Sequence, residues 1–244
     1  MNLKVVLATS KRLLLQLRHD PPTIALIFIV PCMLLTILKY VFWNDVELFH
    51  RIGPMMVGIF PMVLMFVVAS VATLRERTAG TLDRLMVSAI SRVDLVFGYA
   101  LAFSFVALLQ ASLACFVMLN FLGVPVVGGA LPLIIGAVLS AFLGVSLGLF
   151  VSAFAKTEFH AVQFMPAFLL PQFLTCGVLG PRDNMAQLFQ WFADVMPLTY
   201  SVDGMKLITT QTAWSYQLTK DFLIVVICGL LALYIGAKTI RRQE

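Results

Sequence analysis

The side chains best suited to chemistry are scattered along this chain. His19, His50 and His160 lie on different segments, and the sequence contains no H-E-x-x-H, G-x-S-x-G or D-x-x-D pattern. Asp203, beside Gly204, stands alone, whereas a membrane phosphotransferase needs several carboxylates to hold its metal ions. We therefore expect no catalytic residue and no metal site, and we interpret Asp203 as a capping or loop-ordering residue.

The sequence also lacks the patterns that indicate binding of ATP or of nucleic acid. There is no G-x-x-x-x-G-K-[ST] loop to cradle ATP phosphates, so ATP-driven work would need another chain. The four cysteines fall singly in apolar runs, which favours buried apolar residues over a disulfide framework. The net charge of +5 comes from basic residues spread over loops without interleaved aromatic residues, which indicates membrane orientation and no nucleic-acid partner.

Composition indicates that this is a membrane protein. Hydrophobic residues make up 61% of the 244 residues, charged residues 12%, and mean hydropathy is +0.97. Soluble domains are roughly 45–50% apolar and about 25% charged. The apolar runs do not alternate as strands would, and each is long enough to cross about 30 Å of hydrocarbon as a helix. The sequence predicts an all-α integral membrane protein, one transmembrane domain over 1–244, with six spans near 23–43, 54–74, 95–120, 130–154, 160–180 and 221–238.

Basic residues set the orientation of these spans. Twelve Lys and Arg fall on the side that holds both termini and four on the other, with Lys39 inside the first span near the second face. We therefore expect both termini to lie in the cytoplasm.

Two segments outside the spans are amphipathic. Residues 3–20 place apolar side chains opposite Lys4, Lys11 and Arg18, which predicts a helix in the cytoplasmic membrane interface. A plain helical tail is the alternative. Residues 177–206 are too polar to span, and we expect a re-entrant turn followed by an amphipathic helix on the outer face. The stripe of that helix comprises Met185, Leu188, Phe189, Phe192 and Val195.

The fourth span has one face without side-chain bulk, because small residues recur every fourth position. This pattern predicts close helix packing, within the chain in preference to a second copy. The residues are Gly136, Ser140, Gly144, Gly148 and Ser152.

The stretch "TLRERTAGTLDRLMVSAISRVDLV", 73–96, carries seven of the chain's charged residues. Thr81 can cap a short helix whose first turn holds Asp83. Leu82, Leu85 and Met86 then share a face, so the element offers an apolar ridge with a charged rim. This pattern favours a docking surface over a solvated loop.

The same stretch resembles the loop between the second and third spans of ABC-2 type permeases, which has an E-R-x-x-G-T-L-[ED]-x-L core. "MPLTYSVDGMK" resembles the P-L-T-Y-x-V-D-x-[LM]-[RK] segment before the last span of that family. Ala89 replaces a usual proline and Tyr99 a common lysine. The matching residues are Glu76, Arg77, Gly80, Thr81, Leu82, Asp83, Leu85, Ser91 and Arg92 in the loop, and Pro197, Leu198, Thr199, Tyr200, Val202, Asp203, Met205 and Lys206 downstream.

The resemblance implies a half-sized permease in the cell (inner) membrane that pairs with a second permease subunit and with two ABC ATP-binding subunits. ATP and Mg would be bound by those partners, and this chain would bind no cofactor. In the family the loop at 75–92 couples to the ATPase. The coupling residues implied here are Arg75, Glu76, Arg77, Gly80, Thr81, Leu82, Asp83, Arg84, Leu85 and Met86.

The resemblance also implies an exporter in which substrate passes along the subunit interface, beside the second and fifth spans. Gln163, Phe164, Phe168 and Gln172 are the candidate pathway residues. We expect a drug-like compound or lipid as substrate, with polysaccharide or glycolipid as the alternative. A secondary transporter is disfavoured because mid-membrane ionisable residues are nearly absent. A membrane lipid enzyme would have to rely on Asp203.

Overall fold

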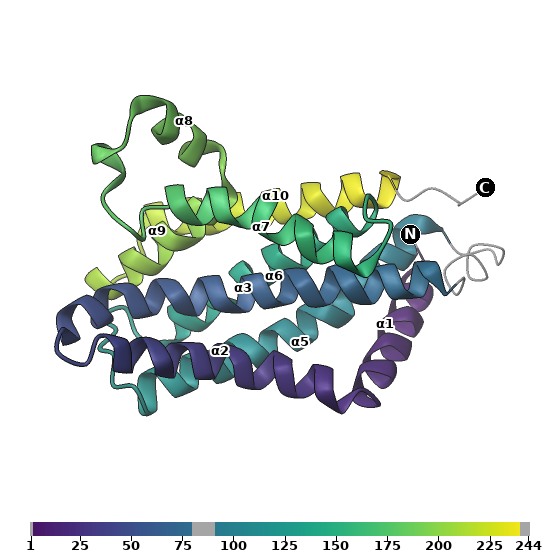
Figure 1. The fold of residues 1–244 in the computed structure, drawn as a ribbon, viewed down its shortest axis with the longest axis horizontal. Helices are drawn as coiled ribbons and strands as arrows, with labels where there is room; N and C mark the ends of the chain where they lie inside the picture. The colour runs from purple at the N-terminus through teal and green to yellow at the C-terminus, as the bar shows by residue number, and fades with distance from the viewer. Residues whose placement is uncertain (1, 80–90, 240–244) are drawn as a thin grey trace.

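The computed structural model describes residues 2–79 and 91–239, and it is all-helical over these ranges (Figure 1). The axes of the longer helices are roughly aligned, and the chain runs up some of them and down others. The helices are α1 (Leu3–Arg18), α2 (Pro21–Val41), α3 (Val46–Thr78), α5 (Arg92–Asn120), α6 (Ala130–Ser152), α7 (Glu158–Thr175), α8 (Gln187–Val195), α9 (Pro197–Thr210) and α10 (Tyr216–Thr239), with a 3-10 turn at Arg182–Asn184. At one end of the bundle, called the terminal end, α3 stops, α5 starts and α10 stops. At the other end, called the hairpin end, α2 turns into α3 and α5 turns into α6.

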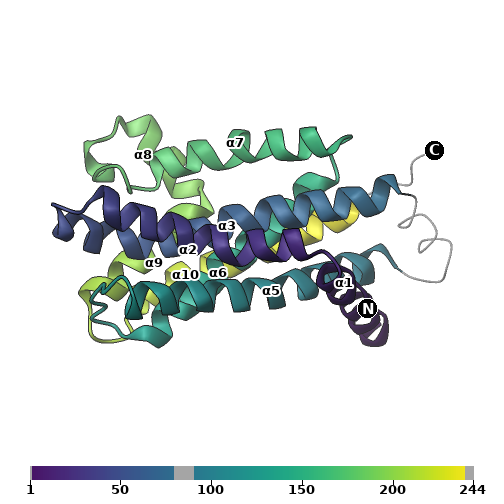
Figure 2. The ribbon, with the colours of Figure 1, turned by 60° about the horizontal axis from the view of Figure 1, so that its bottom comes forward.

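Helix starts follow capping chemistry that is visible in the sequence. Asp20 lies just after α1 and caps α2, accepting from the Thr23 amide at 3.3 Å, and Pro21 occupies the first helical position. The hydrogen bonds from Thr23 lower the pKa of the Asp20 carboxyl. Asp45 caps α3 in the same way, accepting from the Leu48 amide at 3.0 Å. The sharp break between α1 and α2 lets α1 lie across the end of the bundle (Figures 1 and 2).

Within the described residues, five helices are long and apolar enough to cross a membrane: α2, α3, α5, α6 and α10. The predicted fifth span, 160–180, corresponds to α7, which has 18 residues and is not among these five helices. It stops at Thr175, before a turn in which Gly177 has φ +85°, a conformation that favours glycine. A sixth crossing therefore stays a prediction.

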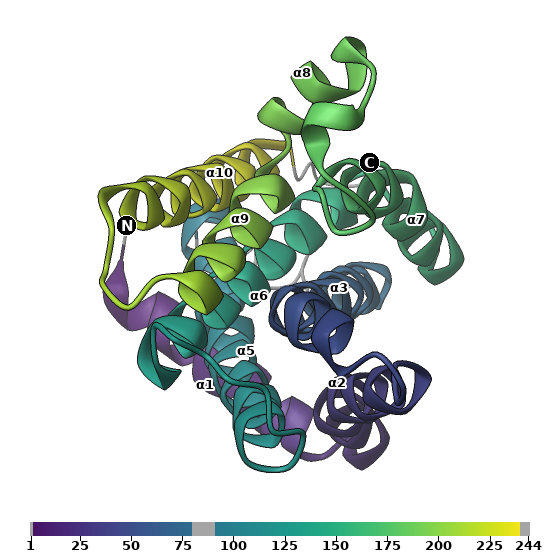
Figure 3. The same cartoon turned by 90° about the vertical axis from the view of Figure 1, so that its left-hand side faces the viewer.

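The segment at 177–206 contains more helix than the sequence pattern indicated. The predicted amphipathic helix is α8, which projects from the bundle at the hairpin end (Figures 1 and 3). A further helix, α9, begins with Pro197 at its first position and carries the whole second motif. The re-entrant turn is not established by these elements. Asp203 lies in the middle of α9, so the interpretation of this residue as a helix cap was wrong.

The centre of the bundle is the contact between α3 and α6 (Figure 3). The small-residue face of α6 packs within the chain, as predicted. A Cβ built on Gly144 would lie 2.1 Å from the carbonyl oxygen of Met62, and one on Gly148 would lie 2.4 Å from that of Phe66. The Ser140 hydroxyl hydrogen-bonds with Ser201 of α9. Only glycine permits this backbone approach, and it makes α3 the helix that other elements surround.

We therefore predict that Gly144→Ala destabilises the fold. The added Cβ meets backbone that cannot rotate away, so overpacking of about 1–3 kcal/mol should outweigh the roughly 1 kcal/mol gained from helix propensity. Gly180→Ala is the control, because a Cβ there meets nothing within 4 Å. The midpoint of thermal unfolding in detergent should fall for Gly144→Ala only. Equal midpoints for the two variants would contradict the packing described.

Candidate functional site

The last turns of α3 carry three consecutive charged residues of the predicted coupling set, Arg75, Glu76 and Arg77. Successive residues on a helix point about 100° apart, so the three side chains leave α3 in different directions. Each reaches a different part of the bundle. The rest of the set, Gly80, Thr81, Leu82, Asp83, Arg84, Leu85 and Met86, lies outside the described residues.

Glu76 joins α3 to α1 and α5. Its side chain is only 4% exposed, and its Oε2 accepts hydrogen bonds from Arg12 Nη2 at 2.7 Å and from the hydroxyl of Tyr99. Arg12 Nη2 also donates to the Tyr99 hydroxyl oxygen at 3.2 Å. Burial lowers the pKa of the Arg12 guanidinium, but the hydrogen bond and charge of Glu76 outweigh it and the pKa is raised. The result is a charge-assisted junction of three helices.

Arg77 joins α3 to the end of α6. Its Nη1 donates to the carbonyl oxygens of Ser152 at 2.8 Å and Ala153 at 3.0 Å, and Nη2 donates to that of Ala155. The last carbonyls of a helix have no partner within the helix and carry the negative end of its dipole. The Arg77 guanidinium therefore caps α6 and holds its end against α3.

Arg75 joins α3 to the first turn of α7. Its Nε and Nη2 donate to the two carboxylate oxygens of Glu158 at 2.8 and 3.0 Å. These hydrogen bonds lower the pKa of Glu158. Both side chains are more than half exposed, so the pair contributes less than about 1 kcal/mol. Its role is to fix the direction in which α7 starts.

The start of α5 is tied to α1 as well. Ser91 caps α5 by accepting from the Asp94 amide at 3.1 Å, and the Asp94 carboxylate accepts from the Asn2 amide at 3.0 Å. Asp94 is buried. Both helices that flank residues 80–90 are thus anchored on α1. The roles of Arg12, Asp94 and Glu158 were not predicted, because nothing in a single sequence shows which distant residue each of them meets.

A groove of about 510 Å³ lies beside this network, between α1, α2 and α3. Its polar residues, Gln16, Asp20, Thr23 and Arg75, lie at the terminal end. Along α2 its wall is then apolar and ends at Leu34. From Thr23 to Leu34 the helix rises about 16 Å, roughly half the thickness of a bilayer's hydrocarbon core. The groove is therefore one leaflet deep, with a polar mouth.

The predicted pathway residues lie on α7 but do not line this groove; their neighbour Met165 does. Gln163 is exposed, and Phe164 and Phe168 have ring centroids 6.5 Å apart. Gln172 is buried and accepts from the Leu198 amide at 3.4 Å, which ties α7 to α9. Their role as a substrate pathway stays a prediction.

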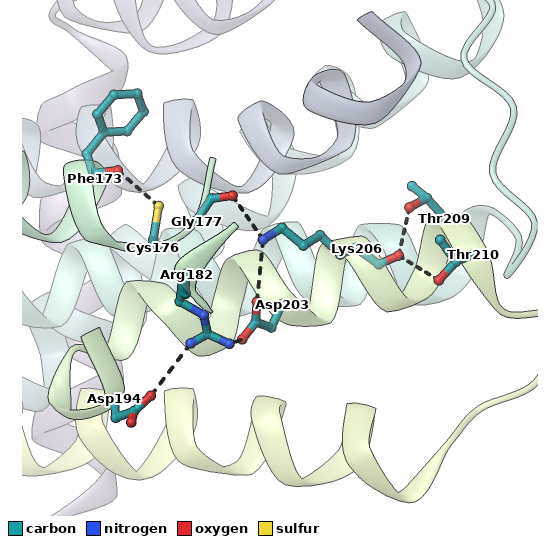
Figure 4. A network of polar contacts seen from close by, with 9 residues as sticks. All are labelled: Phe173, Cys176, Gly177, Arg182, Asp194, Asp203, Lys206, Thr209 and Thr210. Atoms are coloured by element: carbon teal, nitrogen blue, oxygen red, sulfur yellow. Dashed lines mark hydrogen bonds and ion pairs between the residues drawn. The ribbon is translucent and has the colours of Figure 1, made fainter. Parts of the chain in front are cut away.

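At the hairpin end the second motif organises the segment that follows α7 (Figure 4). Asp203 accepts from Arg182 at 2.5 Å and lies 3.7 Å from Lys206 Nζ, which in turn donates to the Gly177 carbonyl oxygen at 3.1 Å. Burial raises the pKa of Asp203 against the charges of both cations. Asp203 therefore fastens the turn at 177–182 to α9, which is a loop-ordering contact.

Other residues of this motif also hold α9 and its neighbours in place. Pro197 starts α9, and Leu198 and Thr199 are buried. The Tyr200 hydroxyl donates to the Asp194 carbonyl oxygen at 2.6 Å, which holds the end of α8 against α9. No group of three or more His, Cys, Asp or Glu side chains able to hold a metal ion occurs in residues 2–79 and 91–239.

These features define a multi-pass helical membrane protein whose charged contacts are gathered at the two ends of the bundle. The family model described as ABC-2 type transporter matches residues 4–209, and the chain belongs to that family.

Curated relatives agree with this assignment. The chain is 25% identical over 195 residues to ABC transporter G family member 20 of Dictyostelium discoideum, covering 79% of this chain and 27% of the relative. It is 27% identical to the inner membrane transport permease YhhJ of Escherichia coli K12, covering 68% and 45%. It is 26% identical to the probable multidrug ABC transporter permease YbhR of the same organism, covering 70% and 47%. The chain thus matches less than half the length of each of these relatives.

We predict that the Arg12–Glu76 contact stabilises the fold. Arg12→Gln should lower the unfolding free energy by about 1–2 kcal/mol, less than the roughly 3–5 kcal/mol of a fully buried pair, because Arg12 is 35% exposed. Lys11→Gln, its exposed neighbour, is the control. In a double-mutant cycle measured by thermal unfolding, Arg12→Gln and Glu76→Gln should be non-additive. Additive losses would show that the two side chains do not interact.

Proposed function

We propose that this chain is the membrane-spanning permease subunit of an ATP-driven ABC exporter. Two ATP-binding subunits, which carry ATP and Mg, and a second permease subunit complete the transporter. The terminal end faces the cytoplasm in a cell (inner) membrane. The family membership and the permease names of the E. coli relatives support this proposal.

The observation that carries it is the set of contacts made by Arg75, Glu76 and Arg77. These residues link α3 to α1, α5, α6 and α7 at the start of the predicted coupling segment, 75–92. A force applied to that segment therefore acts on five helices together, not on one loop.

The proposed mechanism follows from this linkage. ATP binding closes the ATPase pair, and the docked segment moves with it. The linked helices then switch between inward-facing and outward-facing arrangements. Such a switch requires ATP to bind the two states with different affinity. Pro61, inside α3, and Pro166 and Pro171, inside α7, are the proposed bend points.

The groove supports a hydrophobic or amphipathic substrate. Its apolar walls reach the bilayer midplane, while Asp20 and Arg75 lie at its mouth. An amphiphile in the cytoplasmic leaflet would place its chain between α2 and α3 and its polar group at the membrane surface. The name of the relative YbhR, a probable multidrug permease, agrees with this substrate class.

We predict that Leu82→Asp combined with Leu85→Asp removes the ATPase from the complex. Charge on the predicted apolar ridge should disrupt docking, because apolar anchors dominate such interfaces. The complex is purified through the permease, and ATP hydrolysis per permease is measured. The co-purified ATP-binding subunit is identified by the phosphate-binding loop in its sequence. Leu188→Asp combined with Val195→Asp, at exposed positions of α8, is the control. If the ridge variant retained the ATPase, the coupling assignment would be wrong.

We also predict that Leu26→Trp, which fills the groove, lowers export of a lipophilic dye severalfold. Ile29→Trp is the matched control: Leu26 and Ile29 lie on α2 and are 57% and 60% exposed, but Ile29 does not line the groove. Efflux from vesicles loaded with dye and supplied with ATP measures both. Equal efflux by the two variants would exclude the groove from the pathway.

A further inference from the structure

A second hollow, of about 480 Å³, lies at the hairpin end, on the side where α2 turns into α3. Its floor is apolar and buried: Phe49 is 2% exposed and Leu122 is 6% exposed. Phe42, Trp43 and Val46 form the walls, and the ring of Trp43 stacks on Tyr40 with centroids 5.6 Å apart. Tyrosine and tryptophan are typical of the level at which a bilayer's hydrocarbon meets its headgroups.

Two basic side chains, Lys39 and His50, line this hollow, and no acidic residue does. Lys39 lies two residues before the end of α2, and its ammonium has a single long hydrogen bond, 3.4 Å to the Phe121 carbonyl oxygen. Across the described ranges, the salt bridges involve other residues, so Lys39 has no carboxylate partner. The nearby Asp45 accepts from the Leu48 amide and caps α3.

We propose that this hollow binds an anionic phospholipid of the leaflet at the hairpin end. Lys39 and His50 would donate to the phosphodiester, the aromatic walls would hold the glycerol backbone, and the acyl chains would lie along the exposed apolar surface of α2. Phosphate suits these donors because it is an anion with several acceptor oxygens. The hollow and the absence of acidic residues in its lining distinguish this site from simple snorkelling of Lys39 to the interface. The proposal does not depend on the transport function.

Trp43 provides a direct test. With Trp191→Phe and Trp214→Phe in the full chain, the fluorescence is that of Trp43. Brominated phosphatidylglycerol, added to the detergent-purified protein, should quench Trp43 at roughly five- to tenfold lower concentration than brominated phosphatidylcholine. Both lipids carry the phosphodiester, but the choline cation of phosphatidylcholine offsets its charge and weakens the net attraction to Lys39. Equal quenching by the two lipids would overturn the proposal, whether or not any further variant folds.

The variants test the residues. Lys39→Gln should abolish the preference for phosphatidylglycerol and Lys39→Arg should retain it, since both arginine and lysine bind phosphate. Arg51→Gln is the matched control, because Arg51 lies beside His50 on α3 and is exposed but does not line the hollow. If Arg51→Gln lowered the preference for phosphatidylglycerol as much as Lys39→Gln, the preference would come from general surface charge. That result would overturn the proposed site.

Inorganic phosphate separates a lipid site from a phosphate site. Added at millimolar concentration, it should not relieve the quenching by brominated phosphatidylglycerol, because it gains nothing from the aromatic walls. Full relief would show that free phosphate is the ligand and would overturn the lipid assignment.

Discussion

The buried carboxylate of Glu76 is the interaction on which the terminal end depends. A carboxylate that is 4% exposed is costly to keep charged unless cations and donors compensate it. Arg12 supplies the charge and Tyr99 a hydroxyl, and they come from α1 and α5. Neither helix can move away from α3 without removing one of the two donors to Glu76 Oε2. The free-energy cost of losing these donors therefore holds α1, α3 and α5 together as one unit.

Glu76 can be surrounded in this way only because α3 is central. That position follows from glycines on α6, which let the carbonyl oxygens of Met62 and Phe66 approach the neighbouring backbone. Side chains at 75, 76 and 77 then find a different helix in each direction. A helix at the edge of the bundle would direct at least one of the three charges into lipid. Packing in the middle of the membrane thus determines which contacts form at its end.

The sequence predicted the features that depend on local pattern. The apolar runs, the Asp20 and proline break after α1, and the small-residue face of the fourth span each need only a few adjacent residues. The internal partner of that face was also predicted, and Gly144 and Gly148 confirm it. Pairings between distant residues were not accessible: Arg12 and Glu76 are 64 positions apart, and Arg12 was counted only among the basic residues that set the orientation of the spans. The helix α9 was missed because its polar residues suggested a loop. In the structure two of them, Asp203 and Lys206, pair with the preceding segment.

The groove and the hollow described above both border α2, and packing explains why. Only 17% of its most apolar window is buried, against 61% for α3, and its buried residues, Ile27, Pro31 and Leu35, form one narrow stripe. Much of the remaining surface of α2 is exposed, including Leu26, Ile29 and Met33. Toward the terminal end it forms a groove with a polar mouth, and toward the hairpin end a hollow with a lysine. Apolar side chains in lipid gain little from further burial in protein, because lipid tails are equally apolar. A weakly packed helix therefore costs the fold little stability in a membrane, and it leaves space for amphiphiles at both of its ends.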